Sequence, residues 1–156
     1  MNSNQQVSDY IYYYPQVLDK TACDNIINHY NTDTFSGWKT STFATTSSNT
    51  GTSKVDMKEY WIGPKDMFYK NIQKGFEKAV NDYVSVNDKI KVQEYTWFRI
   101  NCYETGGFMK EHIDNIHHSH GQKQGYAVVF PSNFMFPHEV EKVTSGVRYS
   151  IMTWIL

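Results

Sequence analysis

The spacing of the apolar residues changes near residue 90, and this change limits the fold more than any other feature of the sequence. Before it, an apolar residue recurs every three or four positions, which predicts a helix from about residue 65 to 83. The residues of this stripe are Phe68, Ile72, Phe76, Val80 and Tyr83. After it, residues 90–103 alternate, and apolar runs at 125–132, 138–143 and 147–156 are separated by turn-like residues, so this part predicts strands.

The N-terminal half adds a second helix and shorter strands. Asp19 is a good N-cap, and Ala22, Ile26 and Tyr30 follow it on one helical face. Aromatic segments at 10–17, 38–43 and 55–62 predict strands. Helices followed by strands predict an α+β fold, or a β core with helices along one flank.

Size and charge exclude several kinds of protein. A chain of 156 residues suits one domain, spanning residues 1–156. Its net charge of -1 gives no global field for nucleic acid or an anionic membrane surface. No segment approaches the ~20 apolar residues that span a bilayer, and two cysteines form no disulfide framework. We therefore expect a soluble, cytoplasmic protein without a nucleic-acid or membrane partner.

One segment is rich in hydroxyl side chains. Residues 36–54 contain eleven Ser or Thr among nineteen residues, which favours a loop because few of them bury apolar surface. A solvated connection is the simpler interpretation, and a lid over a binding site is the alternative.

The first candidate for chemistry is the pair His112 and Asp114. On a strand, residues two apart point to the same side, so this pair can present a nitrogen and an oxygen to one ion. Composition alone produces a His-x-Asp/Glu pair often by chance. The pair is therefore weak evidence without further ligands.

The C-terminal run supplies those further groups. His138 lies at the start of a predicted strand, and Arg148 and Ser150 alternate onto one face of the next. A guanidinium fork and a hydroxyl together suit a carboxylate. Two histidines and one carboxylate on a face of an octahedron leave three positions open, as in non-haem Fe(II) oxygenases.

These motifs resemble the Fe(II)- and 2-oxoglutarate-dependent dioxygenases, and among them the prolyl 4-hydroxylase-like group known from phage and bacteria. The matching segments are CYETGGFMKEHID at 102–114 and GYAVVFPSNFMFPHEVEKVTSGVRYSIMTW at 125–154, with looser similarity in the N-terminal half. The resemblance implies a double-stranded β-helix, of the jelly-roll or cupin-like kind, flanked by N-terminal helices.

The resemblance also implies a role for each matching residue. His112, Asp114 and His138 would bind Fe(II), while Arg148, assisted by Ser150, would pair with a carboxylate of 2-oxoglutarate. Tyr103 would point its phenol toward the co-substrate or the iron. With O2, the reaction would release succinate and CO2 and hydroxylate a prolyl residue, or another C–H bond of a polypeptide or small molecule. Zinc and nickel suit the same ligands.

One spacing departs from the family pattern. His112 and His138 are only twenty-six positions apart, where the family usually holds three further strands. We therefore expect some core strands to be missing, one from the larger sheet and two from the smaller, leaving unpaired edges. This departure keeps open an alternative function, a catalytically impaired metal-binding or interaction module that retains the iron ligands.

The remaining histidines and the second arginine have simpler interpretations. We expect His117, His118 and His120 to lie in a loop, where an accessory metal site is the less favoured alternative. His29 ends a predicted helix and suits its dipole. Arg99 shares a strand face with Tyr103, yet such an arginine is more often paired at the surface than bound to substrate.

Overall fold

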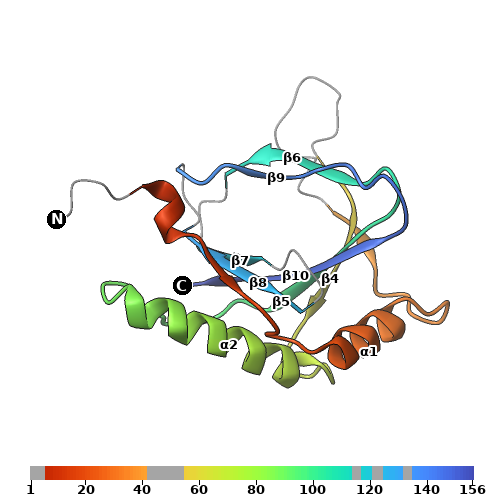
Figure 1. The fold of residues 1–156 in the computed structure, drawn as a ribbon. Helices are drawn as coiled ribbons and strands as arrows, with labels where there is room; N and C mark the ends of the chain where they lie inside the picture. The colour runs from red at the N-terminus through yellow and green to blue at the C-terminus, as the bar shows by residue number, and fades with distance from the viewer. Residues whose placement is uncertain (1–5, 42–54, 114–116, 121–124, 132–134) are drawn as a thin grey trace.

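The computed structural model describes residues 6–41, 55–113, 117–120, 125–131 and 135–156, and for 117–120 it describes the backbone (Figure 1). In chain order the elements are a 3-10 helix at Val7–Tyr10, β1 (Tyr12–Tyr14), α1 (Lys20–Tyr30), β2 (Lys39–Thr40), β3 (Val55–Asp56), β4 (Lys58–Ile62), α2 (Tyr69–Val86), β5 (Phe98–Tyr103), β6 (Phe108–His112), β7 (His117–His120), β8 (Ala127–Phe130), β9 (His138–Val140) and β10 (Arg148–Ile155).

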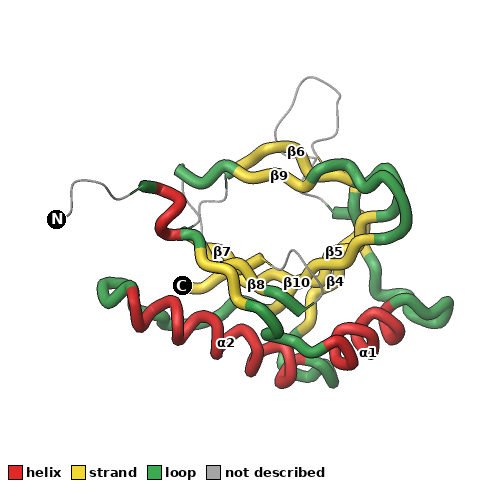
Figure 2. The backbone as a smooth tube through the Cα atoms, viewed as in Figure 1, coloured by secondary structure: helices red, strands yellow, loops and turns green. Residues whose placement is uncertain are grey.

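Two sheets face each other, and the helices cover the outer face of the larger one (Figures 1 and 2). The larger sheet has seven strands in the order β1-β8-β7-β10-β5-β4-β2, and the smaller has three in the order β3-β6-β9. All the strand pairs described are antiparallel. The architecture is compatible with the double-stranded β-helix that the sequence resemblance implies, with its helices on one flank.

Both predicted helices form, and most residues of their apolar stripes are buried, whereas Ala22 and Phe68 are only partly buried. The Asp19 carboxylate accepts a hydrogen bond from the Ala22 backbone N–H at 2.7 Å, which caps α1. Helix α2 begins at Tyr69, later than predicted, because a turn at 63–66 precedes it, closed by the Asp66 N–H to the Gly63 carbonyl.

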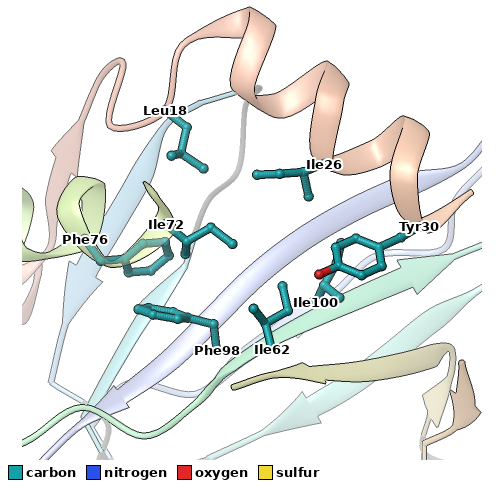
Figure 3. Packing of buried hydrophobic residues seen from close by; sticks show 8 residues of the cluster. All are labelled: Leu18, Ile26, Tyr30, Ile62, Ile72, Phe76, Phe98 and Ile100. Atoms are coloured by element: carbon teal, nitrogen blue, oxygen red, sulfur yellow. The ribbon is translucent and has the colours of Figure 1, made fainter. Parts of the chain in front are cut away.

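The main hydrophobic core lies between the two helices and the larger sheet. Figure 3 shows side chains from α1, α2, β4 and β5 meeting there. The buried members are Leu18, Ile26, Tyr30, Ile62, Ile72, Phe76, Phe98 and Ile100. Because this core fills one face of the larger sheet, the opposite face is left for the space between the sheets.

Two predicted strands were partly wrong. The single strand expected at 55–62 is two strands in different sheets, because the chain passes from the smaller to the larger sheet at the buried Met57. The long strand expected at 90–103 is regular only from Phe98, and Tyr95 forms an isolated bridge with Ile155. Local alternation cannot show where a chain changes sheets or partners.

The loop expected at residues 117–120 was also wrong. These residues form β7, which pairs with β10 on one side and β8 on the other. Backbone hydrogen bonding to two neighbours makes a strand of a segment with no apolar alternation. The accessory metal site considered there concerns side chains outside the described part of the structure.

The expectation of missing core strands stays a prediction. Strands β7 and β8 lie on either side of the shortened segment and pair directly, so the larger sheet continues across it. In the described residues the smaller sheet ends at β9 on one side and at the two-residue β3 on the other. The Ser/Thr-rich stretch lies mostly outside the described residues, and no described helix is long and apolar enough to span a membrane.

Candidate metal and co-substrate site

A small cavity of about 70 Å³ lies between the two sheets, and most of the predicted site residues line it. The larger sheet contributes alternate residues of β5 and β10, and the smaller sheet contributes both histidines. The lining residues are Arg99, Asn101, Tyr103, Met109, His112, Val128, Phe130, His138, Glu139, Val140, Arg148, Ser150 and Met152. Segments far apart in the sequence therefore meet here.

His112 and His138 face each other across the smaller sheet. They are register partners on β6 and β9, beside an irregularity in the pairing between Met109 and His112. Their ring centroids are 4.3 Å apart at an interplanar angle of 59°. Phe130 of the larger sheet packs edge-on against His138, with centroids 5.4 Å apart. Strand pairing thus brings together two imidazoles that are separated in the sequence.

The hydrogen bonds of these histidines set their tautomers. His112 Nδ1 lies 2.9 Å from the Lys110 carbonyl, and His138 Nδ1 lies 3.1 Å from the Phe136 carbonyl. A carbonyl oxygen only accepts, so each Nδ1 carries the proton, and in the neutral ring the lone pair is on Nε2. The Nε2 atom of His138 is buried. Metal-binding histidines commonly have this arrangement, because the bond at one nitrogen orients the other.

The third predicted ligand, Asp114, lies outside the described residues. Among the described residues, no three His, Cys, Asp or Glu side chains gather into a group that would hold a metal. The structure therefore brings together two of the three predicted ligands, and the assignment of all three stays a prediction.

Arg148 and Ser150, the predicted carboxylate clamp, lie on the larger sheet and line the same cavity as the two histidines. Arg148 and Tyr103 are register partners on β10 and β5, and the guanidinium carbon lies 5.5 Å from the centre of the phenol ring. Two positions along, Ser150 is opposite Asn101, whose amide donates to the serine hydroxyl at 3.4 Å. Arg148, Ser150 and Tyr103 thus line one cavity. Alternation predicted the shared face of Arg148 and Ser150, and the family resemblance implied the position of Tyr103 near them.

Tyr103 keeps its proton over the whole neutral range. Burial raises the pKa of its phenol to about 12, although the neighbouring Arg148 and Arg99 act in the opposite direction. The side chain is 1% exposed. A phenol that stays protonated is a hydrogen-bond donor, which suits a carboxylate or carbonyl ligand.

Arg99 is buried, contrary to the surface position that we expected. It is 5% exposed and lines the cavity. Its guanidinium lies 3.4 Å from a Glu59 carboxylate oxygen and 2.7 Å from the Met152 sulfur, and it stacks over Trp61 and Trp154 at 5.7 and 5.1 Å. In the sequence, only the strand face that Arg99 shares with Tyr103 could have indicated this burial. The tryptophans that cover Arg99 come from other strands, so alternation along one strand does not reveal them.

A larger cavity, of about 390 Å³, lies on the helix side of the larger sheet. Its walls are mostly apolar side chains of α1 and of the outer sheet face, and neither His112 nor His138 reaches it. Arg148 and Ser150 border both cavities, but the Arg148 guanidinium stacks on Tyr103 in the space between the sheets. We assign the chemistry to the smaller cavity because the candidate ligands converge there.

The fold is similar to that of solved prolyl hydroxylases. The similar structures include a Pseudomonas putida prolyl-4-hydroxylase, with TM-score 0.70, 13% identity and coverage of 96% of each chain. Another is a Trichoplax adhaerens prolyl hydroxylase in complex with a hypoxia inducible factor peptide fragment, with TM-score 0.69, 16% identity and coverage of 96% of this chain and 84% of that one.

A third is a viral collagen prolyl hydroxylase from Paramecium Bursaria Chlorella virus-1 in its 2OG complex, with TM-score 0.64, 14% identity and coverage of 96% of this chain and 98% of that one. No protein-family model and no curated protein match the sequence. At these identities the likeness concerns the fold, and it agrees with the resemblance seen in the sequence motifs.

Proposed function

We propose that this protein is an Fe(II)- and 2-oxoglutarate-dependent dioxygenase that hydroxylates a C–H bond and releases succinate and CO2. Its proposed substrate is a prolyl residue or another site in a polypeptide, with a small molecule as the alternative. The convergence of His112, His138 and Arg148 in one cavity carries this proposal. The similar structures in complex with 2OG and with a peptide support the co-substrate and the polypeptide.

The chemistry of the donor groups fits a metal ion. In the proposal, the Nε2 atoms of His112 and His138 and the carboxylate of Asp114 hold Fe(II). Hydrogen bonds at both Nδ1 atoms orient the imidazoles before the ion arrives. The bound iron would supply the redox chemistry that couples O2 to the decarboxylation of 2-oxoglutarate.

The residues of the larger sheet bind the co-substrate in this proposal. Arg148 offers a two-pronged, charge-assisted hydrogen bond to a carboxylate. The guanidinium lies over the buried Tyr103 ring, and the phenol and the Ser150 hydroxyl add donors beside it. Arg148 and Ser150 are only partly exposed, so water competes for these hydrogen bonds less than it would at an open surface.

The test is 2-oxoglutarate consumption coupled to succinate formation by the Fe(II)-loaded protein. We expect turnover in the natural sequence and its loss in His112→Ala and in His138→Ala. His29→Ala is the matched control, because His29 is an exposed histidine at the end of α1. Turnover that persists in both site variants would contradict the site assignment.

One observation favours the second candidate function, a metal-binding or interaction module without turnover. The cavity of about 70 Å³ is smaller than the roughly 300 Å³ at which small-molecule sites usually begin. Calorimetric titration with Zn(II) and then with 2-oxoglutarate separates the two candidates. Binding of both supports the dioxygenase, whereas metal binding without co-substrate binding favours the module.

A further inference from the structure

Two exposed tryptophans extend the cavity face of the larger sheet beyond the cavity. Trp61 is 39% exposed and Trp97 is 56% exposed. Trp61 is the register partner of Arg99, so its side chain shares the cavity face. A Cβ on Gly63, two positions after Trp61, would lie 3.2 Å from the Trp97 ring, so this ring lies flat over the glycine. We call Trp61 and Trp97 the tryptophan ledge.

The backbone that carries the ledge is held firmly. The Thr96 N–H donates to the Trp154 carbonyl at 2.9 Å, and the Trp154 N–H donates to the Thr96 hydroxyl at 3.0 Å. The Thr153 hydroxyl donates to the Thr96 carbonyl at 2.9 Å. Trp97 is therefore an exposed aromatic residue on a fixed backbone, which lowers the entropy cost of binding to it.

The surroundings make the ledge apolar and electrically neutral. Trp61 stacks on the buried Trp154, with ring centroids 5.7 Å apart and planes 22° from parallel. Arg99 lies over both rings, and its charge is balanced by Glu59 at 3.4 Å. An exposed, rigid apolar surface beside a cavity is typical of a binding site. A ring or other apolar side chain fits this surface better than a charged group does.

Trp97 directly precedes β5, a strand that lines the cavity, and Trp61 lies on the neighbouring β4. Asn101 and Arg99 on β5 line the cavity, and Trp97 lies two positions beyond Arg99. Four positions separate Asn101 from Trp97, a span of at most roughly 13 Å at about 3.3 Å per residue. An extended peptide lying over this face covers the same distance in about four residues.

We propose that the tryptophan ledge binds a phenylalanine, tyrosine or proline ring of an extended polypeptide substrate, about four residues from the residue that enters the cavity. This inference rests on the proposed function and makes its substrate class more specific. Aromatic-lined surfaces bind extended and proline-rich segments in this way, since ring stacking adds to the burial of apolar area.

The test is peptide binding, measured by fluorescence anisotropy with metal-free protein and labelled Gly-Ser peptides of about twelve residues. Each peptide has one central proline, and one phenylalanine is moved from about two to six positions away on either side. We expect the tightest binding at a separation of about four residues on one side. Trp97→Ala should weaken that peptide roughly tenfold and leave the peptide without phenylalanine unchanged.

Tyr13→Ala is the matched control, because Tyr13 is a 65% exposed aromatic residue on β1, at the opposite edge of the larger sheet. Affinity that is independent of the phenylalanine position, or equal losses in both variants, would overturn the inference. So would a dimer in sedimentation experiments that dissociates in Trp97→Ala, because the ledge would then bind a second copy. Peptide binding can be measured without turnover. A negative result here would therefore count against the ledge, and a negative succinate assay would count against the proposed function.

Discussion

At the scale of single residues, the site consists of side chains whose orientation is set by a neighbour. Each histidine donates from Nδ1 to a carbonyl two positions before it in its own chain. Arg148 is stacked on Tyr103 and Arg99 on two tryptophans. Such contacts hold ligand-binding groups in place before the ligand arrives, and this lowers the entropy cost of binding.

The position of Arg148 predicts that 2-oxoglutarate binding depends on the planar shape of the guanidinium as well as on its charge. Arg148→Ala should weaken 2-oxoglutarate binding to the Zn(II)-loaded protein by roughly 10- to 100-fold, the value of about one charge-assisted hydrogen bond. The affinity of Arg148→Lys for 2-oxoglutarate should lie between those of the natural sequence and Arg148→Ala, because lysine keeps the charge and loses the planar fork. Calorimetry gives both constants. Lys89→Ala, whose side chain is 92% exposed, is the control, and equal affinity in all four proteins would contradict the clamp.

The ion pair between Arg99 and Glu59 predicts a coupled effect on stability. Their side chains are 6% and 14% exposed, so Arg99→Met leaves a largely buried carboxylate without its countercharge, at a cost of about 3 kcal/mol. The double variant with Glu59→Gln should recover much of that loss, because no buried charge remains. Urea denaturation of the four members of the cycle measures the coupling. Additive losses would show that the pair does not interact.

At the scale of elements, close approach of backbones decides how the helices pack on the rest of the chain. Gly75 lies in α2, where a Cβ would collide with the Val17 carbonyl in the segment between β1 and α1. Gly125 precedes β8 with a φ of +76°, a left-handed value that favours glycine, and a Cβ there would collide with the Leu18 carbonyl. The segment before α1 is therefore held closely on both sides.

Gly75→Ala separates helix propensity from packing. Alanine in a helix interior should stabilise by up to about 1 kcal/mol, but the collision with a backbone carbonyl requires α2 or the segment before α1 to shift. We expect net destabilisation of about 1–3 kcal/mol, measured by thermal or urea unfolding. Lys78→Ala, also within α2, provides the control for a substitution without a collision. A stabilised Gly75→Ala would show that the two segments separate at little cost.

At the scale of the whole molecule, twelve tyrosines make stability sensitive to alkaline pH. Burial raises the pKa of Tyr103 and of Tyr83 to about 12, from an ordinary value of 10.0. Burial is also the largest cause of the raised pKa of Tyr30, where a hydrogen bond to Asp66 adds to it. In each case the folded state favours the neutral phenol over the phenolate.

These shifts predict the direction of alkaline unfolding. Below pH 10.0 the phenols are neutral in both states, and their full contribution to stability is present. Above that pH the unfolded chain ionises first, so each such tyrosine removes roughly 1.4 kcal/mol per pH unit until its folded pKa is reached. Urea midpoints measured between about pH 8 and pH 12 should fall steeply above pH 10.

Two substitutions test whether buried tyrosines cause the fall in stability above pH 10. Tyr83→Phe removes one buried phenol and should make the slope above pH 10 shallower, although loss of its hydrogen bond to the Tyr10 carbonyl at 3.1 Å lowers stability at all pH values. Tyr13→Phe, at a 65% exposed position, should leave the slope unchanged. An equal change of slope in both would contradict the role of burial.

The sequence by itself determined the features that depend on neighbours along the chain. The helical stripe from Ile72 to Tyr83 and the N-cap at Asp19 need only a local period and one side chain, and both are present in the structure. Alternation also placed Arg148 and Ser150 on one face of β10, where both line the cavity. The family motifs agree with the fold of the similar structures.

Only the tertiary structure decided the features that depend on a second segment. Met57 marks a change of sheet because β6 pairs on one side of it and β5 on the other. Residues 117–120 form a strand because β10 and β8 supply its hydrogen bonds. Arg99 is buried because Trp61 and Trp154 cover it from neighbouring strands. Pairing and burial are properties of two or more segments, and no period within one segment contains them.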